Sequence, residues 1–467
     1  MNDLLKYIAL KPVKDMASGA LRCLTLAAVV VATTFAAGAA LTFNNVPGGY
    51  EAIEETPAAS TGLERVYVVW NTGRSQAQYR AASASATVRW YRFSNLGGGF
   101  AEEIPSYRNG DISYINLTEE DMGYIVEEGT TRSCYWVVNY SNHMAHLTQI
   151  EIAPDQSECD RVTLTVGEDA APRIAYYTIN GMQQTLSRDL KLTYNSLEYS
   201  EEQQQYVSTV VEKTLESASG NIHTDQPLCE TYFTLNGDRF LTRWGMEQQA
   251  VSPSMAPIAI AVTTTAEESE RQNDNEQREE GSDAMGGSGP VTILFKAAVT
   301  DAVVYKEWQF SRDASFEVID LRIQETEVEH VFNEQGTTYV RFVAGNDSGS
   351  CDYYSDTYTV YIGESRLECP NAFSPGASEG TNDEWKVSYK SIISFECSIF
   401  NRWGQLMCHF TDPSKGWDGK YRGKLVPSGV YYYVIRAKGT DGKEYKKSGD
   451  INIIKFKNES RSGSSAE

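Results

Sequence analysis

The chain shows repeated short runs in which apolar and polar residues alternate, separated by clusters of Gly, Asn, Asp and Ser. Alternation with a period of two places every second side chain on one face of a β-strand, and the intervening clusters favour turns. The pattern therefore predicts an all-β fold. Tyr206–Leu215 fits a strand or a short helix equally well. The other runs are Arg65–Trp70, Ala86–Phe93, Cys134–Tyr140, Thr148–Ile152, Arg161–Val166, Arg173–Ile179, Leu190–Tyr194, Glu230–Leu235, Asp238–Trp244 and Gly429–Ala437.

Two apolar runs near the C-terminus, Ser394–Phe400 and Gln405–Phe410, flank Asn401-Arg402-Trp403-Gly404 and predict a hairpin. A tight turn centred on Arg402 and Trp403 gives a register that gathers apolar and sulfur side chains on one face. It pairs Phe400 with Gln405, Ile399 with Leu406, Cys397 with Cys408 and Phe395 with Phe410. Directly opposed positions bring Cβ atoms within disulfide reach, so Cys397 and Cys408 are the first candidate disulfide. Two buried thiols are the alternative.

The N-terminus predicts export. Basic residues precede the apolar run Leu24–Ala40, which ends in small residues where Ala37-Gly38-Ala39 fits a cleavage site. We predict a signal peptide at residues 1–40 and no stable transmembrane segment after its removal, with an uncleaved membrane anchor as the alternative. Seven cysteines then remain, and this odd number leaves at least one thiol unpaired in a monomer. The sequence contains no C-x-x-C pair, so it does not support a zinc or thioredoxin-type redox site.

Turn signals and composition divide the rest of the chain into modules. We predict a leader at residues 41–61 and an immunoglobulin-like β-sandwich at 62–168, in which Trp90 is the core tryptophan and Tyr124 lies in a tyrosine-corner strand. A second β domain follows at 169–265. Residues 266–289 carry eight acidic and two basic residues and no aromatics, which predicts a disordered linker. A third sandwich at 290–364, a final sandwich at 365–456 and a polar tail at 457–467 complete the chain.

Several motifs follow one another in order within the final sandwich. They are carried by Pro370, Asn371, Phe373, Pro375, Asn382, Asp383, Asn401, Arg402, Trp403, Gly404, Gly416, Trp417, Asp418, Gly419, Pro427, Gly429, Tyr431, Tyr433 and Gly449. This pattern resembles the gliding-motility-associated C-terminal domain, the type B sorting domain of the type IX secretion system of Bacteroidota. The resemblance implies that the machinery of that system at the outer membrane is a partner, and that the protein is secreted or displayed at the cell surface.

The third sandwich resembles a polycystic-kidney-disease-type (PKD-like) domain. The residues that carry this are Lys306–Phe310 around Trp308, His330–Ala344 around Gly336, Asn346 and Tyr358–Ile362. The resemblance implies tandem immunoglobulin-like and PKD-like β-sandwiches that end in the sorting domain.

The candidate chemistry of the chain is sparse. His143 and His146 have a spacing that suits metal binding on a helix, but the local pattern is strand and loop, where they face opposite sides. Gly345–Gly349 resembles a serine-protease segment but has no matching triad spacing. No P-loop, G-x-S-x-G or dinucleotide motif occurs. Glu119-Glu120-Asp121 would serve glycoside hydrolysis only within a cleft that pairs two carboxylates. We predict no cofactor, and no motif supports calcium.

Charge narrows the possible partners. The 63 acidic and 41 basic residues give a formal net charge of −22, which argues against nucleic acid and anionic membranes as partners. The favoured function is a non-catalytic secreted or surface protein whose β-sandwiches present a binding or adhesion region. The alternatives are a glycan- or host-protein-binding module within residues 62–265 and, third, a hydrolase in the same region.

Overall fold

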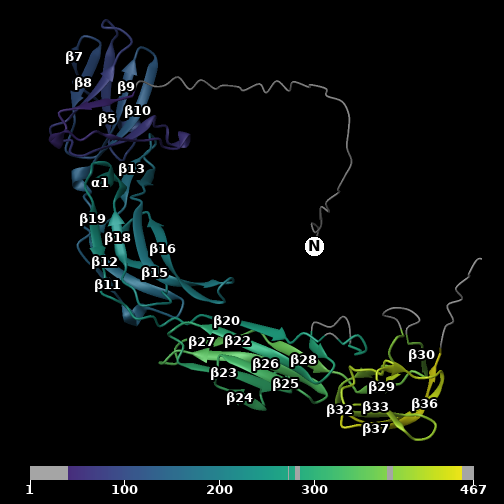
Figure 1. Cartoon of the computed structure of the whole chain (residues 1–467). Coiled ribbons are helices and arrows are strands. Elements are labelled where there is room, and N and C mark those ends of the chain that lie inside the picture. The colour runs from purple at the N-terminus through teal and green to yellow at the C-terminus, as the bar shows by residue number, and fades with distance from the viewer. Residues whose placement is uncertain (1–39, 272, 279–283, 376–381, 455–467) are drawn as a thin grey trace, which may run out of the picture.

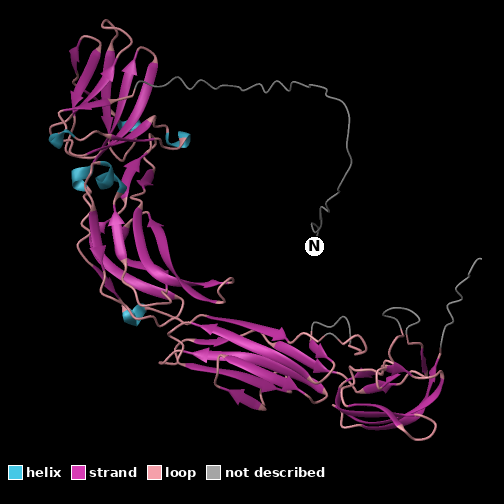
Figure 2. Cartoon of the chain, viewed as in Figure 1, coloured by secondary structure: helices cyan, strands magenta, loops and turns pink. Residues whose placement is uncertain are grey.

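The protein is an elongated, curved row of four β-rich domains (Figure 1). The structure, a computed structural model, describes residues 40–271, 273–278, 284–375 and 382–454. The predicted signal peptide and C-terminal tail lie almost wholly outside this range. Strands make up nearly all of the regular structure (Figure 2), which confirms the all-β prediction. Among the described residues, no helix combines the length and apolar composition of a membrane span.

The first domain, residues 42–139, packs a four-stranded sheet (β1-β4-β8-β7) on a six-stranded one (β2-β3-β10-β9-β5-β6). Trp90 and Tyr124 are both buried between the sheets, and Trp90 Nε1 donates to Ser113 Oγ at 3.0 Å. The strands are β1 (Thr42–Asn44), β2 (Ile53–Glu55), β3 (Arg65–Val69), β4 (Gln76–Arg80), β5 (Val88–Phe93), β6 (Glu102–Ile104), β7 (Tyr107–Asn109), β8 (Ile112–Asn116), β9 (Met122–Glu128) and β10 (Thr131–Asn139).

The second domain, residues 150–251, is built from sheets of order β11-β12-β17, β13-β14 and β16-β15-β18-β19. Tyr206–Leu215, which fitted either element, lies in β16. The strands are β11 (Ile150–Ile152), β12 (Arg161–Ala171), β13 (Ile174–Tyr177), β14 (Gln183–Leu186), β15 (Leu190–Ser200), β16 (Gln205–Leu215), β17 (Ala218–Asp225), β18 (Thr234–Gly237) and β19 (Gln248–Val251).

The run Asp238–Trp244 was wrongly predicted as a strand and contains the short helix α1 (Arg239–Arg243). Asp238 caps this helix, because its Oδ1 accepts the Leu241 N–H at 2.9 Å. Phe240 and Leu241 are buried on the side of the helix that faces the first domain. The helix therefore depends on a cap and on burial, which a search for alternation does not detect.

The third domain, residues 262–362, has sheets β20-β22-β25 and β21-β28-β26-β23-β24, with β27 paired to β26. Trp308 is fully buried, and its ring lies 5.3 Å from Phe295 and 5.0 Å from Phe342. The strands are β20 (Val262–Glu268), β21 (Met285–Gly287), β22 (Val291–Val299), β23 (Tyr305–Ser311), β24 (Leu321–Ile323), β25 (Glu327–Phe332), β26 (Gly336–Gly345), β27 (Asp352–Tyr354) and β28 (Tyr358–Ile362).

The C-terminal domain, residues 366–453, contains a five-stranded sheet of order β30-β37-β36-β32-β33 and the small pairs β29-β31 and β34-β35. The strands are β29 (Arg366–Glu368), β30 (Ala372–Phe373), β31 (Ser388–Lys390), β32 (Ile392–Phe400), β33 (Leu406–Phe410), β34 (Lys420–Tyr421), β35 (Lys424–Leu425), β36 (Gly429–Gly439) and β37 (Glu444–Ile453).

Three of the predicted domain boundaries are wrong. The leader at 41–61 contains β1 and β2, which extend the sheets of the first domain. The boundary at 168 falls inside β12, and β12 pairs with β17 of the second domain. The third domain starts at β20, well before residue 290. In each case a strand joins a sheet through partners far along the chain, which local composition does not reveal.

The acidic segment 266–289 is also not a disordered linker over its described part. It begins in β20 and ends in β21, and its Arg271 and Arg278 lie within 4 Å of Glu268. Residues 273–277 lie along β31 of the C-terminal domain. Tyr389 N–H donates to Asn275 O at 3.1 Å, and Gln277 N–H donates to Tyr389 O at 2.7 Å. Pairing with a strand edge and internal ion pairs satisfy the polar groups that composition alone assigned to solvent.

A buried ion pair of the second domain lies at its junction with the first domain. Arg188 Nη1 donates to Asp238 Oδ2 at 2.5 Å, and both side chains are fully buried. Tyr140, at the end of the first domain, donates its hydroxyl to both oxygens of the same carboxylate at 3.0 and 3.1 Å. The remaining Arg188 N–H groups donate to Pro172 O and His143 O, each at 2.6 Å. One hydrophobic core also continues through both domains at this junction.

A disulfide between Cys159 and Cys351, with the Cα atoms 5.6 Å apart, links the second domain to the third. The predicted Cys397–Cys408 disulfide is wrong, since both thiols are free. The loop Arg402-Trp403-Gly404 has three residues and a left-handed Gly404 at φ 81°, and a bulge then shifts the register. Phe400 therefore pairs with Leu406, Ile399 with Cys408 and Cys397 with Phe410. The two cysteines are diagonal neighbours and do not face each other.

Removing the Asp238 charge is expected to destabilise the first two domains, because Arg188 would remain buried without its counter-ion. We expect Asp238→Asn to lower the local free energy of unfolding by about 3–5 kcal/mol. Native-state hydrogen exchange of the β10 and α1 amides measures this. The control is Glu212→Gln, which removes the exposed Lys191–Glu212 pair and should change the same quantity by less than about 1 kcal/mol. Equal effects of the two substitutions would contradict a structural role for the buried pair.

The cysteine pairing is testable by mass spectrometry of a non-reduced digest of the full chain. We expect a crosslinked peptide that joins Cys159 to Cys351 and none that joins Cys397 to Cys408, because only the first pair is bonded in the fold. The opposite result would mean that the hairpin register differs from the one described here.

Candidate docking groove in the C-terminal domain

Most residues of the C-terminal sequence motifs build the core of that domain. Phe373, Trp417 and Tyr431 are buried, and the Trp417 ring lies 5.7 Å from Phe373 and 5.1 Å from Tyr431. Trp385, beside the Asn382-Asp383 motif, exchanges two backbone hydrogen bonds with Trp417, at 2.9 and 3.0 Å. These motif residues are therefore explained by folding alone.

The glycines at two motif positions permit close approach. A Cβ at Gly416 would lie 2.6 Å from Lys386 Cγ and 3.0 Å from Trp385 O, so a side chain there would separate the two tryptophan segments. A Cβ at Gly449 would lie 2.8 Å from the Tyr433 hydroxyl oxygen, because the Tyr433 ring covers that position from the paired strand. Both glycines are required by packing.

The polar motif residues mainly fix loops. Pro370 O accepts Trp385 Nε1 at 2.7 Å, and Asn371 O accepts the Asn452 N–H at 2.9 Å. Asp418 accepts the Lys420 N–H at 2.9 Å and Lys420 Nζ at 2.8 Å. Burial would raise the pKa of Asp418, but these hydrogen bonds and the Lys420 charge hold that pKa below its ordinary value. Asn382 adopts a left-handed conformation at φ 56°, and its carbonyl accepts the Ser374 N–H.

Arg402 and Trp403 differ from the other motif residues because they do not build the core. Asn401 Oδ1 accepts the N–H groups of Trp403 and Gln405, both at 3.0 Å, and so fixes the hairpin turn. The turn presents Trp403 with 75% of its surface exposed, and the Arg402 guanidinium lies 4.2 Å from the centre of its ring. A well-ordered turn thus displays a large aromatic side chain in solvent.

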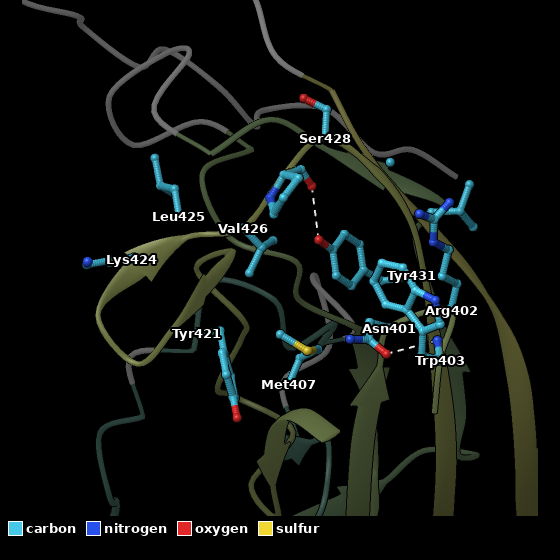
Figure 3. Close-up of a pocket in the computed structure, with 13 residues that line it drawn as sticks. Asn401, Arg402, Trp403, Met407, Tyr421, Lys424, Leu425, Val426, Ser428 and Tyr431 are labelled. Atoms are coloured by element: carbon cyan, nitrogen blue, oxygen red, sulfur yellow. Dashed lines mark hydrogen bonds between the residues drawn. The ribbon is translucent and has the colours of Figure 1, made fainter. Parts of the chain in front are cut away.

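This turn forms one wall of a cavity of about 490 Å³, which we call the hairpin groove (Figure 3). The opposite wall comes from β34, β35 and the loop that leads into β36. The groove is lined by Asn401, Arg402, Trp403, Met407, Tyr421, Lys424, Leu425, Val426, Pro427, Ser428, Gly429, Val430 and Tyr431. Arg402 and Lys424 are the charged residues among these, so the groove is apolar with a basic rim. Tyr431 donates its hydroxyl to Pro427 O at 3.0 Å, which fixes the loop of the second wall.

An exposed apolar face adjoins the groove. Val430, Tyr432 and Val434 alternate along β36 with buried Tyr431 and Ile435, and each is between 44% and 46% exposed. Sequence reasoning identified the turn and the Pro427–Tyr431 segment but did not assign Met407, Tyr421, Lys424, Leu425 or Val426 to a site. The β34–β35 hairpin brings Tyr421, Lys424 and Leu425 to the groove, and Met407 comes from β33.

The histidine, carboxylate and Gly-Asn-Asp-Ser-Gly motifs considered in the sequence lie mostly in turns and loops. His143 Nε2 lies 2.6 Å from Asp121 Oδ2, whereas His146 is exposed. Glu119 and Glu120 lie on an exposed turn and line a cavity together with Glu102, and Gly345–Gly349 runs from the end of β26 into the loop before β27. Burial raises the pKa of the Cys397 thiol to about 12, which keeps this thiol in its unreactive form. Within the described ranges, no three His, Cys, Asp or Glu side chains group closely enough to hold a metal ion.

The protein is a row of β-rich domains, and its C-terminal domain carries the hairpin groove. Residues 367–453 match the family described as the CHU_C type IX secretion signal domain, and residues 151–252 match the fibronectin type III domain. The C-terminal domain is thus a type IX secretion signal domain, and the second domain is of the fibronectin type III class. Such a signal domain implies export to the cell surface or beyond it.

Solved structures with similar parts were also found. Dimeric latent PorU from Porphyromonas gingivalis is 11% identical over 70% of this chain and 36% of its own, with a TM-score of 0.15. The I9–I11 tandem of titin is 11% identical over 64% and 95%, with a TM-score of 0.14. The CbhA fibronectin(III)-like modules of Clostridium thermocellum are 10% identical over 38% and 90%, with a TM-score of 0.17. This chain therefore spans about a third of PorU, and no curated protein matches it. TM-scores this low carry no functional argument.

Truncation of Trp417 should lower the free energy of unfolding of the C-terminal domain far more than truncation of Trp403. Trp417→Ala is expected to lower the free energy of unfolding of the C-terminal domain by about 3–5 kcal/mol, because Trp417 is only 1% exposed. Trp403→Ala should change it by less than about 0.5 kcal/mol, because this side chain supports no core. Hydrogen exchange in the full chain measures both. A large loss for Trp403→Ala would show that its role is structural.

Proposed function

We propose that this protein is a non-catalytic secreted or cell-surface scaffold, exported by the type IX secretion machinery, and that the hairpin groove is the surface which that machinery recognises. The observation that carries the proposal is the exposed, well-positioned Trp403 beside Arg402. A large aromatic side chain with its guanidinium neighbour is the kind of residue pair that dominates binding energy at protein interfaces.

Charge supports the same assignment. Residues 367–453 carry twelve basic and ten acidic residues, whereas residues 40–366 carry 22 basic and 49 acidic residues. The signal domain thus differs in sign from the domains that it accompanies, and the charged side chains of the groove are basic. A partner surface with apolar residues and carboxylates would complement this groove and would be repelled by the rest of the chain.

The junctions between domains support a scaffold role. The first two domains share a core and the hydrogen bonds of Tyr140 to Asp238, and the second and third are joined by a disulfide. The third and fourth are joined through residues 273–277, where Asn275 Nδ2 donates to Val387 O and Pro413 O at 2.7 and 2.8 Å. Such junctions keep the N-terminal domains at a distance from the domain that carries the secretion signal.

The groove assignment predicts that Trp403→Ser/Leu425→Ser blocks export without unfolding the protein. In a bacterium with a type IX system, we expect surface display of this variant to fall about tenfold, while the protein accumulates in the periplasm. Surface labelling and cell fractionation measure this. The matched control is Val304→Ser/Val318→Ser, which changes two apolar residues of the third domain that are 62% and 64% exposed and should leave display unchanged.

The two parts of the proposal fail separately. Normal display of Trp403→Ser/Leu425→Ser would exclude the groove as the recognition surface. A chain that lacks residues 369–467 should remain in the periplasm, and equal display of this truncated chain and the intact one would refute the export route itself.

A further inference from the structure

Two loops are locked together at the seam between the first and second domains. Gly98 N–H, after β5, donates to Ile179 O at 2.7 Å. A Cβ at Gly97 would lie 2.7 Å from Gly181 N, and a Cβ at Gly181 would lie 2.8 Å from Asn95 O. The two backbones therefore touch where only glycine fits, and the loops have little freedom to move apart.

These locked loops display large apolar side chains. Leu96 and Met182 are each 64% exposed, and Phe100 is 73% exposed. Single exposed apolar residues are common on protein surfaces and require no explanation. Here three of them stand on one pair of loops whose backbone contacts fix their positions, which is typical of a binding surface.

A cavity of about 690 Å³ lies beside Leu96 and Phe100 in the first domain. Its charged side chains are Arg92, Glu102, Glu119 and Glu120, and Arg92 already lies 3.5 Å from Glu102. The remaining lining residues are Phe93, Ser94, Thr118 and Met122. The cavity thus combines an apolar wall with carboxylates that exceed the local positive charge.

The loop that carries two of these carboxylates is held in place from the other side. Asn139 Nδ2 and Asn142 Nδ2 donate to Glu119 O at 2.7 and 2.8 Å. Thr72 donates its hydroxyl to Thr118 O at 2.5 Å. These bonds use the backbone of the loop and do not involve the Glu119 and Glu120 carboxylates.

We propose that this cavity, which we call the seam site, binds a segment of a partner protein in which a lysine or arginine stands beside a large apolar side chain. The cation would pair with Glu119 and Glu120, and the apolar side chain would pack against Phe100 and Leu96. Anionic ligands would meet the carboxylates and be repelled. The inference rests on the proposed scaffold function, because it assigns the binding region that the scaffold presents.

The test uses the purified full chain and two dye-labelled peptides of equal length, one of alternating lysine and leucine and one of alternating glutamate and leucine. Fluorescence anisotropy should show binding of the lysine peptide alone, weakening between about 50 mM and 500 mM NaCl because salt screens exposed charges. Glu119→Gln/Glu120→Gln should weaken this binding about fivefold. Phe100→Ser should weaken it by a similar factor.

A matched control separates the seam site from the general acidity of the chain. Glu201→Gln/Glu202→Gln removes two exposed carboxylates from the turn between β15 and β16 and should leave the affinity unchanged. Equal losses in both double variants, or equal binding of the glutamate peptide, would overturn the proposal. A dimer in sedimentation that Phe100→Ser abolishes would also overturn it, because a second copy of the chain would then be the occupant.

The peptide-binding result does not depend on the export experiment, because binding is measured on purified protein. Peptide binding that survives a failure of the export prediction would keep the seam site and reject only the proposed route to the surface. Normal export of a chain that does not bind the lysine peptide would reject the seam site alone.

Discussion

The junction of the first two domains depends on the carboxylate of Asp238. This one group accepts hydrogen bonds from Tyr140, Arg188 and the Leu241 backbone, and so connects the turn that follows β10 to two segments of the second domain, one of which is helix α1. Taking two charges out of water is costly, and the cost is offset only when every donor of the arginine finds an acceptor. Each of the three guanidinium nitrogens of Arg188 has an acceptor, because Nη1 donates to Asp238, Nε to Pro172 O and Nη2 to His143 O. Separation of the two domains would remove the Tyr140 hydroxyl from Asp238 and the His143 carbonyl from Arg188, and would leave this buried charge pair with fewer hydrogen-bond partners.

The aromatic residues around this pair extend the same constraint to the N-terminal segment. The Trp70 ring lies 5.0 Å from Tyr50, 5.3 Å from Trp244 and 5.9 Å from Tyr140, and Trp244 Nε1 donates to Glu51 O. The seam site lies at this same boundary, on loops that meet through glycine backbones. The residues that line the seam site all belong to the first domain, and the contact of Gly98 with Ile179 of the second domain holds their loop in place. A loop that is held in place loses less entropy on binding.

The C-terminal domain is built around one five-stranded sheet, and the two faces of its strand β36 differ. Along β36, the inward side chains Tyr431 and Ile435 build the core, while the outward side chains Val430, Tyr432 and Val434 remain apolar and exposed. These three apolar residues form a stripe next to the hairpin groove, and exposed polar residues such as Arg436, Lys446 and Asp450 surround it on the same face. The stripe enlarges the apolar surface that the groove offers to a partner.

The sequence by itself determined many of the strands, the core tryptophan Trp90 and the character of the last domain. These features are local, because alternation within one strand and a motif within one loop leave their mark on neighbouring positions. The tertiary structure alone decided what depends on distant partners. Cys159 pairs with Cys351 across a separation of 192 residues, and Asp238, the cap of α1, pairs with Arg188 across a separation of 50 residues. Lys424 and Leu425 line the groove because a separate hairpin, β34–β35, lies beside it. Met407 lies at a bulge in β33, which strand alternation does not predict. Such contacts form when packing over the whole fold outweighs the entropy lost in closing long loops. This balance depends on the whole chain and cannot be predicted from a short stretch of sequence.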